Sequence, residues 1–492
     1  MSTVELPSRP TAFQAARDAR APVLVTLALV AICIPVQFAA GPLVLSPIRF
    51  LLLICTVPLF IRLVTGSYGR ILFVDVLIVA HVVWQLVAML HNNPESAVQF
   101  VGSNGLEFLG AYLVARCGIR NRDDFVAFIK LFMLLILLLM PFAMIETQTA
   151  RPVIPDLFRS LGLQGLTDVR ADKRLGLERA QVVFPHPIHY GLFCSTALAL
   201  VYLGLQDRMP RPKRIMLAFA IIISTVMSVS SGALLPLMIQ ISLIAWAGIT
   251  HRTKYRWWLL IAILAPCYLL LEIISDRPAH IALLSHLTFN AHNVYWRTII
   301  FDYGMLNVWA NPIFGLGLKD WVRPSFMHSG SMDNFWLLNA VRFGVPGFLT
   351  VAGAFAIALF RIMHLRFPTD HPLRQIRLAY VVGMISLLLT LCTVHVWGPV
   401  YSLVMLFMGS GIWLITADTA AETFDETSAT EPARPQSRYT RFATQTVPKT
   451  SRANAGTRKA AAVRSRHGTG ASGPPERSHR QSISAGRGPG RR

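Results

Sequence analysis

Long apolar runs alternate with short polar connections along most of this chain. About twelve runs are close to 20 residues long, the length that a helix needs to cross a hydrocarbon core of roughly 30 Å. The predicted spans lie at about 21–40, 46–64, 71–90, 98–116, 124–146, 188–205, 215–230, 232–249, 257–274, 336–360, 378–394 and 398–416. This pattern predicts an all-α polytopic membrane protein in which residues 21–416 form one membrane domain.

The connections between the spans form two alternating sets that differ in their Lys and Arg content. The basic set contains Arg62 and Arg70; Arg116, Arg120 and Arg122; Arg208, Arg211, Lys213 and Arg214; Arg252, Lys254 and Arg256; and Arg361, Arg366, Arg374 and Arg377. The other set includes residues 91–96, which contain neither Lys nor Arg. Cytoplasmic loops carry the excess of positive charge. We therefore expect the basic set and both termini, including residues 1–20, in the cytoplasm.

Two long connections, at about 147–187 and 275–335, fall on the opposite, periplasmic side. They are nevertheless basic: they carry Arg151, Arg159, Arg170, Lys173, Arg174 and Arg179, and Arg277, Arg297, Lys319 and Arg323. Long loops translocate regardless of charge, so each of these residues taken singly is equally consistent with a solvated side chain. As a group they indicate an anion site at the outer membrane face.

Composition supports a membrane location and distinguishes the C-terminal tail from the rest of the chain. Of 492 residues, 53% are hydrophobic and 14% are charged, far from the roughly 25% charged residues of soluble chains. Much of the net charge of +21 lies in residues 417–492, which have few large apolar side chains. We expect this tail to be disordered and cytoplasmic. Lacking a folded motif, it is better suited to anionic lipids than to nucleic acid.

Guanidinium groups near the outer leaflet suit a diphosphate, because arginine grips phosphate oxygens in bidentate fashion. A lipid-linked sugar diphosphate is the natural candidate. Sugar transfer from it requires charge stabilisation of the departing oxygens and a base for the acceptor hydroxyl. This chemistry needs no metal, and we expect neither a metal site nor a cofactor, since no H-E-x-x-H, P-loop or G-x-G-x-x-G pattern occurs.

Three segments carry a family resemblance. They are Arg179-Ala-Gln-Val-Val-Phe-Pro-His-Pro-Ile-His-Tyr-Gly191; Ser228-Val-Ser-Ser-Gly-Ala-Leu234; and Asp333-Asn334 followed by Gly344-Val-Pro-Gly347, preceded by Arg297 and Asn311-Pro-Ile-Phe-Gly-Leu-Gly317. In order, spacing and predicted outer placement, they resemble the O-antigen ligase/polymerase superfamily of bacterial surface-polysaccharide enzymes. Ser231 departs from the pattern, since the family often has arginine there.

The resemblance implies a metal-independent glycosyltransferase in the bacterial inner membrane that uses an undecaprenyl-diphosphate-linked glycan at the periplasmic face. Arg179 and Arg297 are the leading diphosphate ligands, with Arg174 and Arg170 as further candidates; loop packing is the alternative for each. Ligases transfer the glycan to lipid A core and usually have histidine where Asp333 stands. The aspartate favours a polymerase that joins lipid-linked repeat units, and it leaves the ligase as an alternative.

The remaining candidate site residues each have a structural alternative. Asp333 is a candidate acceptor base, but it is also suited to the first turn of a helix. Asn334 is either a substrate ligand or a helix cap. His186 and His328 are catalytic candidates, although a lone histidine at a membrane interface is more often structural.

A transporter of about twelve spans is the rival from another class. Transporters of this size usually have two related halves and ionisable residues at mid-membrane depth. No repeat is evident here, and His81 and Glu107 are the chief ionisable residues near span centres. The polar residues gather in the outer loops, which favours an enzyme. The resemblance implies a chain-length regulator and a flippase of the same pathway as partners.

Overall fold

The computed structural model describes residues 22–40, 43–163, 173–275, 291–368 and 371–417. The N-terminal segment 1–20, Arg170 and the tail beyond residue 417 lie outside these ranges. What the sequence predicts for them stays a prediction.

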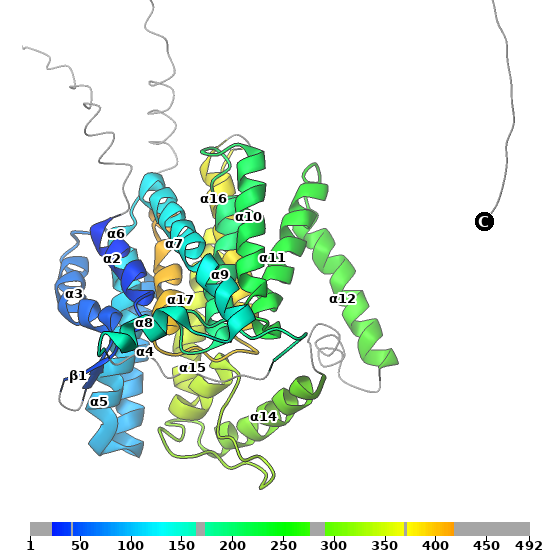
Figure 1. The fold of residues 1–492 in the computed structure, drawn as a ribbon. Helices are drawn as coiled ribbons and strands as arrows, with labels where there is room; N and C mark the ends of the chain where they lie inside the picture. Colours follow the sequence, from blue (N-terminus) through cyan, green and yellow to red (C-terminus); the bar gives the residue numbers. More distant parts are fainter. Residues whose placement is uncertain (1–21, 41–42, 164–172, 276–290, 369–370, 418–492) are drawn as a thin grey trace, which may run out of the picture. The chain divides into compact units, whose positions relative to one another are not determined.

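The described chain is mostly helical, and eight of its segments are long and apolar enough to cross a membrane (Figure 1). They are α3 (Pro47–Val64), α4 (Phe73–Asn92), α7 (Arg122–Thr149), α11 (Ser231–Ile249), α12 (Arg256–Ile274), α15 (Phe335–His364), α16 (Leu373–Thr390) and Pro399–Thr416, which comprises α17 (Pro399–Ser410) and α18 (Trp413–Thr416). The chain is therefore a multi-pass membrane protein.

The other four predicted spans are helical but shorter or interrupted. They correspond to α2 (Val23–Ile32), α9 (Pro187–Tyr202), α10 (Arg211–Val226), and a run of α5 (Pro94–Gly105), the π-helix η1 (Leu106–Gly110) and α6 (Ala111–Gly118). The count of twelve spans and the cytoplasmic position of the termini stay predictions.

The first apolar run is only partly helical, unlike the single span predicted at 21–40. After α2 the chain forms an antiparallel ribbon of β1 (Phe38–Ala40) and β2 (Leu43–Leu45), with Phe38 opposite Leu45. Pro35 lies just beyond the helix, and its missing N–H prevents continuation. Ser46 then caps α3, its hydroxyl oxygen accepting the Arg49 N–H at 3.4 Å.

The interior is organised around α9 and α17, whose residues are almost all buried. Helix α9 packs against α10, α11 and α16, and α17 packs against α6 and η1. At Gly191 on α9, an added Cβ would collide with Ala233 and with Ser228. This close approach holds the start of α9 against the turn between α10 and α11, so two of the family-like segments meet.

Helix α15 is broken at Gly344, which has φ +72°. The break allows residues 311–317 to pack on the helix: Val345 N–H donates to Pro312 at 2.7 Å, and Leu316 N–H donates to the Val341 carbonyl at 2.8 Å. A Cβ at Gly344 would collide with the Ile313 carbonyl. The third family-like segment thus owes its shape to glycine.

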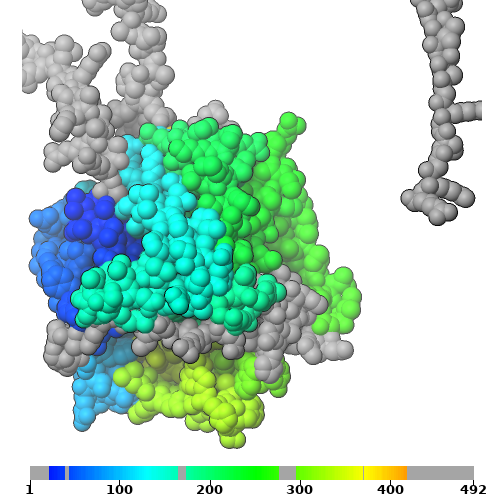
Figure 2. All heavy atoms as spheres, viewed as in Figure 1, coloured from blue at the N-terminus to red at the C-terminus, as the bar shows by residue number. Residues whose placement is uncertain are grey.

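Both long connections contain helices that the apolar pattern did not reveal. They are α8 (Val153–Ser160) and α14 (Ala291–Ala310). Figure 2 shows α8 and its neighbouring residues as a blue-green band lying across this face of the molecule. Helix α14 packs on α15 through a buried cluster that includes Ile300, Val308, Leu337 and Val341. This contact brings Arg297 close to the residues that open α15.

Candidate active site

The segment that carries Arg179 is fastened to the end of α7. Glu146, in the last turn of α7, accepts the backbone N–H groups of Gln181 at 3.0 Å and of Val182 at 2.9 Å. The Glu178 N–H donates to the Thr147 carbonyl at 3.1 Å. One buried carboxylate therefore satisfies two backbone donors that would otherwise be buried unpaired, and it fixes the path of the chain beside Arg179.

Arg174 approaches the same place from a narrow turn. It forms a backbone bridge with Leu177, and its guanidinium donates to the Val229 carbonyl at 3.5 Å. Val229 lies in the turn between α10 and α11, two residues before Ser231. A guanidinium group thus contacts this turn although Ser231 replaces the arginine often found in the family.

The backbone is strained beside both arginines. Val182 has φ +56° and Val229 has φ +41°, in a region that β-branched residues rarely adopt. Such conformations persist only where surrounding contacts enforce them, and they cluster at functional sites. Here the enforcing contacts are the Glu146 carboxylate on Val182 and the ends of two helices around Val229.

Arg297 reaches the site from α14. Its Nε atom is buried and has no hydrogen-bond partner among the described residues. Burial lowers the pKa of Arg297, the Asp333 carboxylate opposes that shift, and the Arg174 charge adds to it. Because arginine titrates far above neutral pH, the group remains a cation with an unused donor.

The three arginines line one pocket of about 480 Å³. The pocket also contains the other residues predicted for catalysis, His186, His328 and Asp333. Of the candidates within the described chain, only Asn334 does not line it. Three guanidinium groups face a single carboxylate, so the pocket carries excess positive charge and suits a polyvalent anion.

His186 is held in one tautomer by the start of α9. It is the N-cap residue, and its Nδ1 atom accepts the Ile188 N–H at 3.1 Å. Burial and then the charges of Arg179 and Arg174 lower the pKa of His186 to about 4. The ring is neutral at pH 7, and its one proton must lie on Nε2. His186 is thus a hydrogen-bond donor to a ligand rather than a base.

Asp333 and His328 are the two exposed titratable groups of the pocket. The Asp333 carboxylate accepts a hydrogen bond from the Ser331 hydroxyl at 3.2 Å. It does not cap α15. Asn334 does so, since its side-chain oxygen accepts the Leu337 N–H at 3.0 Å. The cap alternative therefore applies to Asn334, and Asp333 remains available to substrate.

An apolar groove of about 740 Å³ begins next to this pocket. It lies among α14, α15 and α16 and is lined by Phe301, Met305, Trp336, Phe348, Phe355 and Leu388, among others. Asn334 lines the groove while its neighbour Asp333 lines the arginine pocket. A molecule with an anionic head and a long hydrocarbon tail can therefore occupy both.

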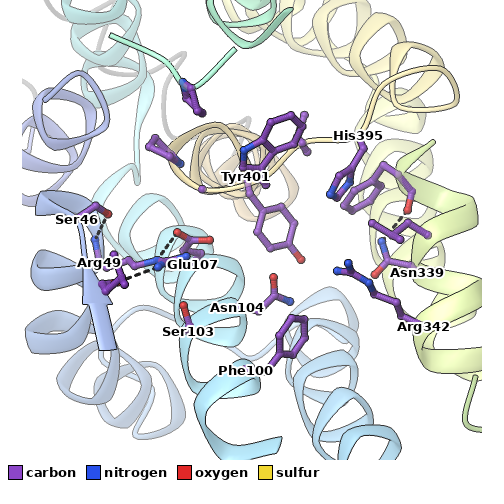
Figure 3. Close-up of a pocket in the computed structure, with 18 of the residues that line it drawn as sticks. Ser46, Arg49, Phe100, Ser103, Asn104, Glu107, Asn339, Arg342, His395 and Tyr401 are labelled. Carbon is purple, nitrogen blue, oxygen red and sulfur yellow. Dashed lines mark hydrogen bonds and ion pairs between the residues drawn. The ribbon is translucent and has the colours of Figure 1, made fainter. Parts of the chain in front are cut away.

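A second polar pocket, of about 470 Å³, was not predicted from the sequence (Figure 3). Its lining includes Arg49, Glu107, Asn339, Arg342, His395 and Tyr401. These residues come from five separate apolar runs or their ends, where each is an isolated polar position. In the sequence, Glu107 is notable only as an ionisable residue within a predicted span. Arg342 lies inside the Asp333-to-Gly347 segment. No local spacing connects them.

The comparison with protein families identifies one region of the chain. The family model described as O-Antigen ligase matches residues 215–352. This places the region in the O-antigen ligase/polymerase superfamily. Its members are glycosyltransferase-like ligases and polymerases. The matched region contains Arg297, Asp333 and Asn334, whereas Arg174, Arg179 and His186 precede it. In a comparison with curated proteins, no match was found.

Proposed function

We propose that this protein polymerises undecaprenyl-diphosphate-linked oligosaccharide repeat units into surface polysaccharide or exopolysaccharide at the periplasmic face of the bacterial inner membrane. The observation that carries the proposal is the convergence of Arg174, Arg179 and Arg297 on one pocket that also holds Asp333. The family match supplies the reaction class. The positively charged pocket and the adjoining apolar groove supply the reasons for a lipid-linked donor.

The donor's diphosphate lies among the three arginines. Each guanidinium can donate two parallel hydrogen bonds to phosphate oxygens, and such bonds strengthen as the bridging oxygen gains charge. The Nε2–H of His186 adds one neutral donor. Hydrocarbon of the lipid occupies the groove between α14 and α15, where apolar burial contributes about 25 cal/mol per Å².

The reaction is a displacement at the anomeric carbon of the donor glycan. The acceptor hydroxyl oxygen forms a bond to that carbon, and the bond to the diphosphate oxygen breaks. The hydroxyl proton passes to the Asp333 carboxylate, and the electron pair leaves with the lipid diphosphate held by the arginines. Asp333 fits the role of base better than His186, whose Nδ1 lone pair is already used by Ile188 N–H.

Aspartate at position 333 favours a polymerase over a ligase. A ligase passing the glycan to lipid A core is the second candidate, because the family match covers both activities. Both use the same donor and differ only in the acceptor. No observation on the described residues favours a transporter over these enzymes.

The test is the pattern of surface and lipid-linked glycans in cells that lack the protein, with the periplasm-facing and cytoplasm-facing lipid-linked pools separated on gels. If the protein is a polymerase, its loss leaves single repeat units on the periplasmic side and no long chains. Long lipid-linked chains with none on lipid A core would identify a ligase instead. Repeat units trapped on the cytoplasmic side would identify a transporter and contradict an enzyme of either kind.

A further inference from the structure

The second polar pocket is formed by parts of the chain that the predicted topology puts on the outer side. Its walls come from the ribbon before α3, the second half of α5, Pro185, the start of α15, and the connection between α16 and α17. It lies beside the arginine pocket. Trp397 links the two, because its ring lies 6.2 Å from His186 of the arginine pocket and 5.6 Å from His395 of the polar pocket, centroid to centroid.

One positive charge in this pocket has no counter-charge. Arg49 is paired with Glu107 at 2.7 Å. Within the described chain, Arg342 makes no ion pair, and its side chain is engaged only with the face of Phe100, whose ring centroid lies 5.8 Å from the guanidinium carbon. A half-buried guanidinium with unused donors is costly unless a ligand supplies the acceptors.

His395 does not add a second charge. Burial and then the Arg342 charge lower the pKa of His395 to about 4, so the ring is neutral at pH 7. Its buried Nδ1 atom has no hydrogen-bond partner among the described residues. Apart from the Arg49–Glu107 pair, the described lining therefore offers one unpaired cation beside neutral polar groups, which matches a monovalent anion. The arginine pocket, with three cations, matches a diphosphate.

The rest of the lining suits a sugar ring. Tyr401, Asn104 and Arg342 point toward a common space (Figure 3). Asn339 uses its amide nitrogen on the Phe335 carbonyl at 2.8 Å, which leaves its oxygen as an acceptor for a hydroxyl. Phe100, Phe343 and the half-exposed Trp397 provide aromatic faces on which the C–H face of a sugar can pack.

We propose that this second pocket binds a carboxylate-bearing sugar, a uronic acid unit of the acceptor, with the carboxylate held in bidentate fashion by Arg342. The proposal rests on the proposed transferase function and names a substrate class for it. A uronate placed here lies beside Trp397, whose ring contacts His186 of the arginine pocket, so the acceptor's hydroxyl end can reach the donor. Acidic repeat units would then be selected by a residue outside the diphosphate site.

The test is direct binding to the full-length protein in lipid nanodiscs, followed by saturation-transfer NMR. The probes are methyl β-D-glucuronide, the neutral methyl β-D-glucoside, and inorganic pyrophosphate. We expect the glucuronide to bind at least about tenfold more tightly than the glucoside, and Arg342→Gln to remove that preference. Arg342→Lys should retain part of the preference, since lysine keeps the positive charge but lacks the planar guanidinium that binds both carboxylate oxygens. Arg297→Gln is the matched control and should leave glucuronide binding intact.

Equal binding of glucuronide and glucoside by the wild type would overturn the proposal. So would glucuronide binding that survives both Arg342 variants, or pyrophosphate that displaces glucuronide and loses its own binding in Arg342→Gln. The last result would make the pocket a second diphosphate site. Failure of the transferase proposal would look different: pyrophosphate binding would survive Arg297→Gln while the glucuronide results stood unchanged.

Discussion

At the scale of single residues, two titratable side chains are candidates for the base that takes the proton of the acceptor hydroxyl. Asp333 and His328 are both exposed and both line the arginine pocket. Asp333 lies close enough to Arg297 for its charge to influence that group's pKa, and hence close to the bound diphosphate. This proximity favours Asp333.

We expect Asp333→Asn to lower the rate of glycan transfer by about 10²–10⁴-fold, the usual contribution of a general base. Diphosphate binding should persist, because the arginines are untouched and a competing negative charge is removed. Asp333→Glu should retain measurable activity. The measurement is transfer between purified lipid-linked oligosaccharides. Full activity in Asp333→Asn together with its loss in His328→Asn would assign the base to His328.

His186 makes stability depend on pH. Its pKa is about 4 in the folded protein, against an ordinary 6.5, so the unfolded chain binds a proton first as pH falls. The free energy of unfolding should therefore be highest above pH 6.5 and should fall as pH drops toward 4. The full effect of this one group is about 3 kcal/mol.

His186→Asn isolates that contribution, since asparagine preserves the capping acceptor for α9. The variant should show a smaller drop in melting temperature between pH 6.5 and pH 4.5 than the wild type. An identical drop in both proteins would mean that His186 is not buried as described.

At the scale of elements, the end of α7 positions the first outer segment. Glu146→Ala would leave the N–H groups of Gln181 and Val182 without acceptors and would free a strained valine to relax. We expect diphosphate affinity to fall by about tenfold or more, with a smaller loss in Glu146→Gln, which keeps one acceptor. Asp156→Ala on α8 is the control, since its carboxylate pairs with exposed Arg159 at the surface and does not line the arginine pocket. Equal affinities in Glu146→Ala and Asp156→Ala would contradict this positioning role.

The sequence predicts the helices that long apolar runs identify. It does not predict the elements that depend on packing against other parts of the chain. Eight predicted spans are confirmed as long apolar helices. Helix α14 was not foreseen, because polar residues such as Arg297, Asp302 and Asn307 interrupt its apolar positions. The early end of α2 follows from Pro35. The span prediction for residues 21–40 rested on the length of the apolar run and gave no weight to this proline. The π-helix at Glu107 has no comparable signal.

The same contrast holds for the two pockets. Arg179, Arg297 and Asp333 could be named in advance because each lies in a segment that resembles the superfamily. Their convergence could not be derived, because it depends on α14 packing against α15 and on Glu146 holding the first segment. Arg342 and His395 were missed, because their shared pocket exists only after distant helices pack together.

At the scale of the whole molecule, the proposed function requires both pockets to face the periplasm. Labelling of single cysteines tests this in a variant whose native cysteines are replaced by serine or alanine. A cysteine at exposed Ser329 should react in intact spheroplasts with a maleimide that does not cross membranes. A cysteine at exposed Arg252 should react only after lysis. The reverse pattern would place the site in the cytoplasm.

The most direct test of the central claim is polymer formation in cells carrying Arg179→Ala or Arg297→Ala in place of the wild type, with membrane levels of each variant measured in parallel. Arg159→Ala is the matched control, because it removes an outer arginine that does not line the pocket. We predict that the two pocket variants insert normally and make no long chains, while Arg159→Ala makes wild-type polymer. Normal polymer in both pocket variants would contradict the account of the arginine pocket as the diphosphate site.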